Sequence, residues 1–595
     1  MIDDRHDRRL ALGAADVLAD FNQADVLAAA DVHVASRLGA MLGETDQQVL
    51  LAAALAVRAV RQGSVCVDLA TVSEVPREED DVELTWPDPV GWIARVAVSP
   101  LVGESVLRLE DSRLYLDRYW REEEQVCTAL LTRLSRPAPD VDAAALAAGL
   151  DRVFGDPGYD EQRDAAEASA RRWTTVLTGG PGTGKTTTVA RLLALVAEQH
   201  EIGTGRLPRI AMCAPTAKAA ARLQEAVAEA TAGLSEVDRD RLGQIPALTL
   251  HRLLGWRPGS SVRFRHDRDN RLPHDVVVVD ETSMVSLTHM ARLLDALRST
   301  ARLVLVGDAD QLASVEAGAV LADVVRGLED HPASPVSRLT VTHRFGGHIG
   351  ELATALREGD ADTVMTLLRA GHDDVELIDP TDADAMASFR SDVRDAALSV
   401  RLPAQDGDKL AAVAALDDHR LLCAHRQGRH GVNGWNREVE RLVADATGVT
   451  HYEEWYAGRP ILVTANDYGL GVFNGDVGVT VRRPDGRLMV ALSDGTSDPR
   501  ELATTRLSDV QTVYAMTVHK SQGSQAKVIS VVMPPEDSPM LTRELFYTAV
   551  TRAQERVRIV GSEAAIRDAI GRQVQRASGL AERLKASGPG SQRMA

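Results

Sequence analysis

The sequence has 595 residues, of which 44% are hydrophobic, so it can bury several cores and form roughly three or four domains. Its formal net charge of −19 argues against general adhesion to polyanions, and any nucleic acid must therefore be held in a defined groove. The first residues contain no apolar signal segment and no apolar stretch is long enough to span a bilayer, so we expect a cytoplasmic protein with no membrane association.

Residues 1–135 carry helical patterns such as LAAALAVRAVR and end in the segment RLYLDRYWREEEQVCTALLTRL. The Pro-containing stretch SRPAPD, residues 135–140, follows and marks a break. The sequence therefore predicts a separate, mainly helical domain over residues 1–135.

A phosphate-binding loop is predicted in residues 176–193, which read VLTGGPGTGKTTTVARLL. The spacing G-x-x-x-x-G-K-[ST] lets backbone N–H groups surround a phosphate, with Lys185 reaching the β- and γ-phosphates and Thr186 holding Mg²⁺. An ordinary Gly-rich turn is the alternative, but lysine occupies only six positions in the chain, which makes a chance match rare. The predicted nucleotide-binding residues of this loop are Gly179, Gly180, Pro181, Gly182, Thr183, Gly184, Lys185, Thr186 and Thr187.

Apolar runs then alternate with helical patterns, which is typical of a parallel sheet with crossover helices. Asp280 and Glu281 end one buried run, DVVVVDE, where Asp280 can hold Mg²⁺ and Glu281 can polarise the attacking water. Gln311 follows the next run, RLVLVGD, and is predicted to sense the γ-phosphate by hydrogen bonding. The four predicted strands are TTVL, RIAMCAP, DVVVVDE and RLVLVGD.

A second α/β core is predicted after the turn-rich stretch at residues 331–337, because the runs RLLCAH, KVISVVM and RVRIVG again read as buried strands. We therefore place the first motor domain at residues 136–334, the second at 335–575 and a disordered tail at 576–595. Two inserts interrupt the pattern: a predicted β-hairpin at residues 257–274, and a small barrel at 458–509 indicated by NGD, PDG and DG turns.

These motifs, in this order, resemble those of superfamily 1 helicases, and within that superfamily the RecD family, the alpha subunit of the RecBCD exodeoxyribonuclease V complex. The resemblance runs from about residue 155 to 562 and rests on nine motifs. Besides the phosphate-binding loop they are YDEQRDA, CAPTAKAAARL, TLHRLLGW, DETSM, GDADQLASVEAG, THRFGGHIGELA, TVHKSQGS and ELFYTAVTRAQERV. The resemblance implies an α/β fold of two RecA-like motor domains with a hairpin insert, an SH3-like insert and a helical N-terminal domain.

The resemblance also implies roles for individual residues. Gln162 is assigned to adenine, and Gln311, Arg344 and Arg552 to the γ-phosphate. For single-stranded DNA, hydroxyl, imidazole and ammonium donors suit phosphate oxygens without reading bases. The residues implied for the DNA path are Thr216, Lys218, His251, Thr517, His519 and Lys520. Gln525 stands where the family commonly has Glu, which puts a ribose or coupling contact there in question.

The leading functional hypothesis is an ATP- and Mg²⁺-dependent translocase and helicase that moves 5′ to 3′ on single-stranded DNA. The resemblance implies RecB-like and RecC-like partners in a heterotrimer that acts on duplex ends in double-strand break repair, and it implies that residues 1–135 dock a partner. We expect no nuclease site in this chain, because no carboxylate cluster with lysine stands outside the ATPase motifs. Two alternatives stay open: a stand-alone RecD-like helicase, and a regulatory ATPase subunit of a repair assembly.

Overall fold

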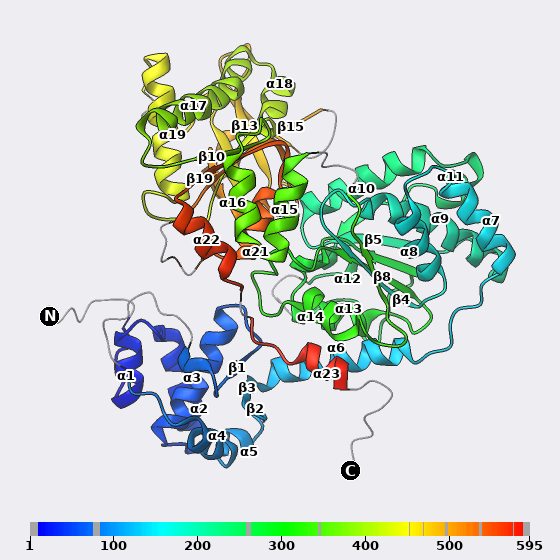
Figure 1. Ribbon diagram of the computed structural model, residues 1–595, viewed down its shortest axis with the longest axis vertical. Coiled ribbons are helices and arrows are strands. Elements are labelled where there is room, and N and C mark those ends of the chain that lie inside the picture. The colour runs from blue at the N-terminus through cyan, green and yellow to red at the C-terminus, as the bar shows by residue number, and fades with distance from the viewer. Residues whose placement is uncertain are drawn as a thin grey trace.

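The computed structural model describes residues 10–74, 84–257, 263–342, 347–450, 453–467, 469–493, 498–534, 538, 540–574 and 576–586. Figure 1 shows three bodies along the chain: an N-terminal region and two α/β domains that carry parallel sheets. The mixed α/β fold with a helical N-terminal region agrees with the predicted fold class. No helix among these residues is both long and apolar enough to cross a membrane.

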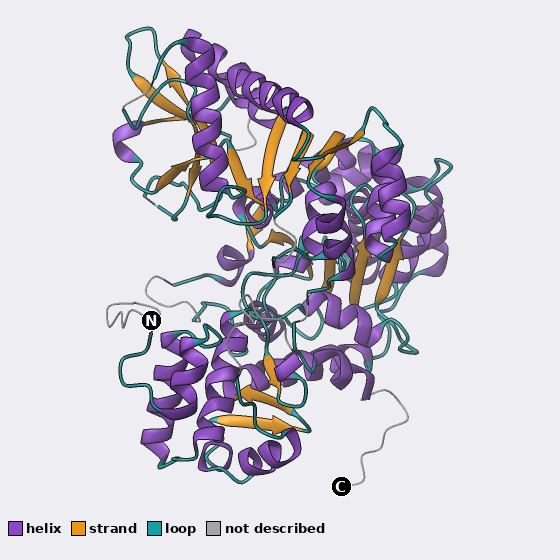
Figure 2. Ribbon diagram, turned by 60° about the vertical axis from the view of Figure 1, so that its left-hand side comes forward, coloured by secondary structure: helices purple, strands orange, loops and turns teal. Residues whose placement is uncertain are grey.

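The N-terminal region is built from short helices around a small antiparallel sheet of order β1-β3-β2. In Figure 2 it lies below the two larger bodies. Its core is a cluster of its own side chains, including Leu51, Leu55 and Trp92. Its elements are α1 (Asp16–Gln23), α2 (Ala29–Leu42), α3 (Gln47–Arg61), β1 (Cys66–Asp68), α4 (Pro89–Ala97), α5 (Pro100–Gly103), β2 (Leu107–Glu110) and β3 (Arg113–Leu116).

The first motor domain contains a six-stranded parallel sheet of order β6-β5-β7-β8-β4-β9. Its strands read as continuous apolar runs because both faces are covered by helices. The strands are β4 (Thr174–Gly179), β5 (Ile210–Ala214), β6 (Ala247–Thr249), β7 (Val276–Val279), β8 (Arg302–Gly307) and β9 (Val336–Leu339). The helices are α6 (Asp117–Leu134), α7 (Ala143–Val153), α8 (Asp160–Ala170), α9 (Lys185–Thr204), α10 (Ala217–Ala232), α11 (Glu236–Leu242), α12 (Leu250–Leu254), α13 (Leu287–Ala296) and α14 (Val320–Leu328).

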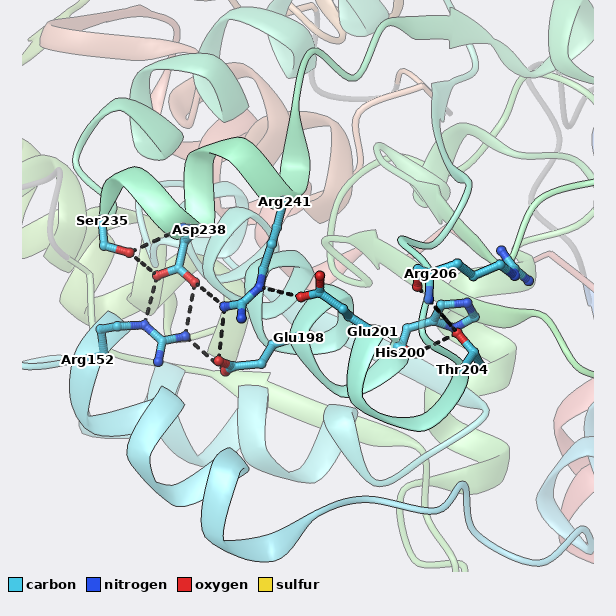
Figure 3. A network of polar contacts seen from close by, with 9 residues as sticks. All are labelled: Arg152, Glu198, His200, Glu201, Thr204, Arg206, Ser235, Asp238 and Arg241. Carbon is cyan, nitrogen blue, oxygen red and sulfur yellow. Dashed lines mark hydrogen bonds and ion pairs between the residues drawn. The ribbon is translucent and has the colours of Figure 1, made fainter.

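A network of ion pairs fastens helices α7, α9 and α11 to one another on the outer side of this domain (Figure 3). Asp238 is fully buried and receives hydrogen bonds from Arg152 at 2.8 and 2.9 Å and from Ser235 at 2.7 Å. Glu198 accepts from Arg152 and from Arg241 at 2.9 and 3.0 Å. Because every charge has a partner, the network tolerates burial and fastens α7 and α11 to α9, which packs on β4.

The second motor domain holds a five-stranded parallel sheet of order β10-β19-β18-β11-β17. The strands are β10 (Val375–Ile378), β11 (His419–Cys423), β17 (Ala515–Thr517), β18 (Ala526–Val532) and β19 (Ala553–Val560). The helices are α15 (His348–Glu358), α16 (Ala361–Arg369), α17 (Ala383–Asp406), α18 (Lys409–Ala414), α19 (Val432–Thr447), α20 (Val518–Ser521), α21 (Arg543–Val550) and α22 (Glu563–Gly571). A final helix, α23 (Leu580–Ala586), follows.

The two predicted inserts differ in outcome. A five-stranded antiparallel sheet of order β15-β14-β13-β12-β16 interrupts the second domain near the predicted bounds, while its SH3-like identity stays a prediction. Its strands are β12 (Pro460–Val463), β13 (Val477–Arg482), β14 (Leu488–Leu492), β15 (Arg500–Ala503) and β16 (Val510–Thr512). The hairpin predicted at residues 257–274 is reduced to one antiparallel bridge between Trp256 and Phe264, and residues 258–262 lie outside the described part of the chain.

The structure moves three predicted boundaries. Helix α6 packs on α13 of the first motor domain, so residues 117–134 belong to the motor core and not to the N-terminal domain. Strand β9 pairs with β4, which extends the first domain beyond residue 334. The prediction of a disordered tail is wrong for residues 576–586, because Leu580 and Leu584 of α23 are fully buried against α14 and α6 (Figure 1). Because most residues around these two leucines are polar, the sequence pattern did not predict a buried helix there.

Candidate nucleotide site and nucleic-acid interface

The phosphate-binding loop connects β4 to α9 and has the backbone that its glycines predict. Gly182 and Gly184 have φ of +83° and +81°, in the left-handed region that favours glycine. A Cβ on Gly179 would lie 2.4 Å from the carbonyl oxygen of Leu339, so a side chain there would collide with backbone. The loop therefore leaves its N–H groups exposed to an anion at the start of a long helix.

Lys185 is the first residue of α9, and its ammonium folds back onto the loop. Its Nζ donates to the carbonyl oxygens of Gly179 at 2.7 Å and Gly180 at 2.8 Å. Burial lowers the pKa of Lys185, and nearby carboxylates, above all Asp308, oppose that shift. The loop thus carries a half-buried cation whose hydrogen-bond acceptors are neutral carbonyls, which suits it to meet a phosphate.

Asp280 and Glu281 follow the carboxyl end of β7 and line the same cavity as Lys185. Burial, and next the charge of Glu281, raise the pKa of Asp280 to about 7. Glu281 itself has φ of +48°, an uncommon conformation for a residue with a side chain. Two crowded, half-buried carboxylates are an oxygen-rich site that fits a divalent cation.

Residues of the second motor domain complete the site through a chain of hydrogen bonds. The Nη2 of Arg552 donates to Oε1 of Gln311 at 2.5 Å, and Nε2 of Gln311 donates to Oδ2 of Asp308 at 3.0 Å. The hydroxyl of Tyr547 donates to the same Asp308 oxygen at 2.9 Å. A polar network therefore links α21 and the turn before β19 to the end of β8.

The cavity enclosed by these groups has a volume of about 610 Å³ and is lined by both motor domains. Of the predicted catalytic, nucleotide and metal residues, those that line it are Pro181, Gly182, Gly184, Lys185, Thr186, Thr187, Asp280, Glu281, Gln311 and Arg552. Gln162 is buried on α8 and donates to the carbonyl oxygen of Thr183 at 2.9 Å, so it contacts the loop itself. Arg344 lies outside the described residues.

Three functional candidates were missed by the sequence reasoning. Asp308 and Tyr547 stand inside quoted motifs, but their pairing joins positions 239 residues apart. Arg222 of α10 donates to the carbonyl oxygen of Gly523 at 3.0 Å and to Oε1 of Gln525 at 3.3 Å. The position of Gln525, where the family commonly has Glu, thus makes a contact across the two domains.

The residues predicted for DNA contact follow the carboxyl ends of parallel strands in both sheets, namely β5, β6 and β17. Thr216 and Thr517 cap the helices that begin there, with hydroxyl oxygens accepting from Ala219 N and Lys520 N at 3.2 and 3.3 Å. Burial, and next Arg420, lower the pKa of Lys218 to about 7. Burial also lowers the pKa of His519 and of Lys520.

His251 already has a partner in the structure. Its Nε2 lies 3.0 Å from Nε2 of His289, and His289 also contacts Ser286 at 2.8 Å. Burial, and next His289, lower the pKa of His251. One of the two imidazoles therefore donates a hydrogen bond to the other, so Nε2 of His251 is already engaged and only its Nδ1 is left for a phosphate.

Comparison with known proteins matches three segments of the chain. The N-terminal domain of the RecBCD enzyme subunit RecD matches residues 23–115, an AAA domain matches 162–317, and a UvrD-like helicase C-terminal domain matches 512–560. The RecBCD enzyme subunit RecD of Mycobacterium tuberculosis is 56% identical, covering 98% of this chain and 99% of that one. The chain belongs to the RecD family. Its predicted class, a superfamily 1 DNA helicase and ATPase, is confirmed at the level of that family.

More distant RecD relatives extend the comparison. The RecBCD enzyme subunit RecD of Haemophilus influenzae is 30% identical over 84% of this chain and 82% of that one. The ATP-dependent RecD2 DNA helicase of Deinococcus radiodurans is 32% identical over 82% of this chain, which spans 61% of that relative's length. Among solved structures, Bacteroides Pif1 bound to ssDNA is 15% identical with a TM-score of 0.38, covering 68% of this chain and 93% of that one.

Proposed function

We propose that this RecD-family chain is an ATP-driven motor that moves 5′ to 3′ along single-stranded DNA and opens duplex ends. We further propose that it acts with RecB-like and RecC-like subunits in a heterotrimeric helicase-nuclease of double-strand break repair. The observation that supports this best is the single cavity lined by the phosphate-binding loop of one motor domain and by Arg552 of the other. The polarity and the partners rest on the family.

The residues of the cavity fit ATP and Mg²⁺. The loop N–H groups and Lys185 suit the phosphates, while Thr186 and the half-buried Asp280 suit the metal, which supplies positive charge to the phosphates when bound. Glu281 is placed to orient and deprotonate water beside them. Arg552 supplies positive charge from the side opposite the loop. Its hydrogen bond to Gln311 couples its position to that of the residue assigned to the γ-phosphate.

Movement of one motor domain against the other can follow from ATP hydrolysis because hydrogen bonds at the nucleotide site join the two domains. The bonds from Arg552 to Gln311, from Tyr547 to Asp308 and from Arg222 to Gly523 all join the first domain to the second. Any change at the γ position that repositions Gln311 or Asp308 therefore shifts one sheet against the other. The DNA residues at the strand ends of both sheets would then change their spacing with each cycle.

The N-terminal region provides a surface for a partner. Its aromatic residues Trp92 and Tyr115 are both buried: Trp92 packs in the region's own core, and Tyr115 packs in the core of the first motor domain, so neither is free to dock a partner. The apolar side chains that it does expose include Val90 and Val98, exposed to 78% and 84%. We propose that a partner subunit covers this side of α4.

The test is to purify the chain alone and together with its partners, and to measure ATP hydrolysis and strand displacement on duplexes with a 5′ or a 3′ tail. We expect hydrolysis that depends on single-stranded DNA, and displacement from 5′ tails. Displacement only from 3′ tails would contradict the polarity, and full helicase activity without any stable partner would favour the stand-alone alternative. Hydrolysis without displacement in any assembly would favour the regulatory alternative.

A further inference from the structure

A second large cavity lies behind the nucleotide site, where the N-terminal region, both motor domains and the C-terminal segment meet. Its volume is about 680 Å³, similar to that of the nucleotide cavity. It is lined by residues of α3 and β1, of the loop after β8, of α14, α15 and α21, and of residues 573–578. Of the residues predicted for catalysis, nucleotide, metal or DNA, Gln311 alone lines it among the described residues, so the proposed chemistry leaves most of this cavity unexplained.

The lining of this cavity is basic although the chain is acidic. The lining holds three carboxylates, Asp68, Asp310 and Glu544, and six guanidinium groups. Arg326 and Arg113 also pair with Asp323 and Glu582 outside the lining, which leaves four arginines against the three carboxylates. A pocket with surplus arginine in a protein of net charge −19 is suited to an anion, and guanidinium groups match the oxygens of phosphate in particular. The six arginines are Arg58, Arg113, Arg326, Arg357, Arg543 and Arg576.

One of these arginines keeps an unused hydrogen-bond donor within the described part of the chain: the Nε of Arg58 is buried and has no partner there. Arg357 lies near the carboxylate of Glu358, but their 3.8 Å separation is beyond hydrogen-bond distance. Burial, and next Arg61, lower the pKa of Arg58. A buried N–H donor without a hydrogen-bond partner is costly, and an incoming anion would relieve that cost.

The two cavities adjoin at Gln311, which lines both of them and forms part of the wall between them. Tyr547 lines the second cavity, and its hydroxyl donates to Asp308, which lines the first. The same hydroxyl lies 3.1 Å from the position that a Cβ on Gly180 would take, so it touches the phosphate-binding loop. The wall therefore stands at the end of the nucleotide cavity where Gln311 and Arg552 meet.

We propose that the arginine-lined cavity is a second phosphate site, which receives the inorganic phosphate product through the wall formed by Gln311 and Tyr547. This inference rests on the proposed ATP hydrolysis. The transfer makes and breaks no covalent bond: the ion leaves Lys185 and Arg552 and gains the donors of Arg58 and Arg357. A phosphate of the DNA backbone has the same chemistry, and the experiment below separates the two sources.

The first measurement is equilibrium binding of inorganic phosphate to the full chain whose nucleotide cavity is filled with ADP and beryllium fluoride. We expect one phosphate to bind, and to bind about tenfold or more weakly in the double variant Arg58→Gln/Arg357→Gln, because hydrogen bonds between charged partners are lost. Arg437→Gln, an exposed arginine of α19, is the control and should bind phosphate as the natural chain does. Thermal melts of all variants verify folding.

Absence of phosphate binding in the natural chain, or equal binding by the double variant, would overturn the site. Failure of ADP and beryllium fluoride to bind at all would instead contradict the proposed function. In a second arm, oligothymidine is added to the phosphate-loaded chain; displacement of the phosphate would assign the cavity to the DNA backbone and overturn the product role.

The second measurement compares ATP cleavage, followed by rapid quench, with the appearance of free phosphate, followed by a fluorescent phosphate sensor. In the double variant we expect cleavage at the natural rate and delayed or altered phosphate release. Identical release kinetics in the natural chain and the double variant would overturn the proposed path.

Discussion

At the scale of single residues, the nucleotide site combines strong local signals with contacts that no local pattern contains. The spacing of Gly179, Gly184, Lys185 and Thr186 predicted the loop, because the phosphate chemistry needs those residues within one turn. The structure adds Tyr547, whose hydroxyl reaches Asp308 from the other domain. Only the packing of two sheets brings these two residues together, so the sequence motifs could contain them without revealing their contact.

Lys185→Ala should abolish ATP hydrolysis, because the loop loses the ammonium that lies on it. Nucleotide binding and DNA-stimulated turnover of the purified variant are the measurements. Lys527→Ala is the matched control: this lysine is about half exposed, pairs with Asp418 at 2.8 Å and should leave turnover unchanged. Substantial turnover in Lys185→Ala would show that another group serves the phosphates.

At the scale of elements, the alternation of apolar runs and helices predicted both parallel sheets, since buried strands are continuous apolar segments. It did not predict which core a helix joins. Helix α6 follows the N-terminal region in sequence, yet Arg133 at its end donates to Thr174, to the carbonyl of Trp173 and to that of Ala301. Those acceptors lie in or beside β4 and β8. The pattern of residues 117–134 predicts a helix but does not indicate which strands it contacts.

Helix α23 should be a fixed part of the first motor domain. Leu584→Ala should destabilise the docking of α23 by about 2–5 kcal/mol, because the leucine side chain is fully buried. The side chain packs against α14 at Gly327, which allows the two helices to approach closely. Lys585→Ala, on the exposed face, should change little. Protease cleavage of the C-terminal segment under native conditions is the measurement, and equal cleavage of the two variants would contradict the docking of α23.

His419, at the start of β11, should make the second sheet sensitive to mild acid. Burial, and next Arg558, lower its pKa from the ordinary value to about 4, and it contacts Ser530 Oγ at 2.9 Å. Between pH 6.5 and 4, His419 is protonated in the unfolded chain but stays neutral in the folded chain. The free energy of unfolding therefore falls as pH falls, by up to about 3 kcal/mol. His419→Gln should flatten the slope of the unfolding midpoint against pH in that window. An unchanged slope would show that the lowered pKa of His419 does not cause the loss of stability.

At the scale of the whole molecule, three bodies meet around the segment that ends the chain. The backbone N–H groups of Val65 and Cys66 both reach the carbonyl of Ala577, so the C-terminal segment joins the N-terminal region before α23 docks on the first motor domain. Composition predicted a disordered end because short polar segments rarely fold alone. Here the segment folds because two other bodies supply its partners.

The position of α6 determines where the N-terminal region can be removed. A chain without residues 1–116 should keep nucleotide binding and DNA-stimulated hydrolysis but fail to join its partner subunits. A chain without residues 1–134 should lose solubility, because removal of α6 exposes the side of the sheet packed by Val126 and Leu130. Co-purification and turnover of the two truncations are the measurements. Full assembly of the chain without residues 1–116 would place the docking surface on the motor domains.

The central claim is that the two motor domains share one ATP site and that Arg552 acts on the phosphates from the second domain. The most direct measurement is ATP binding and DNA-stimulated turnover of Arg552→Gln beside the natural chain, with thermal melts to verify folding. We expect ATP binding close to that of the natural chain and turnover lower by about 10³, as for loss of an arginine finger. Turnover within about twofold of the natural chain, a change too small for the loss of such a group, would contradict the account.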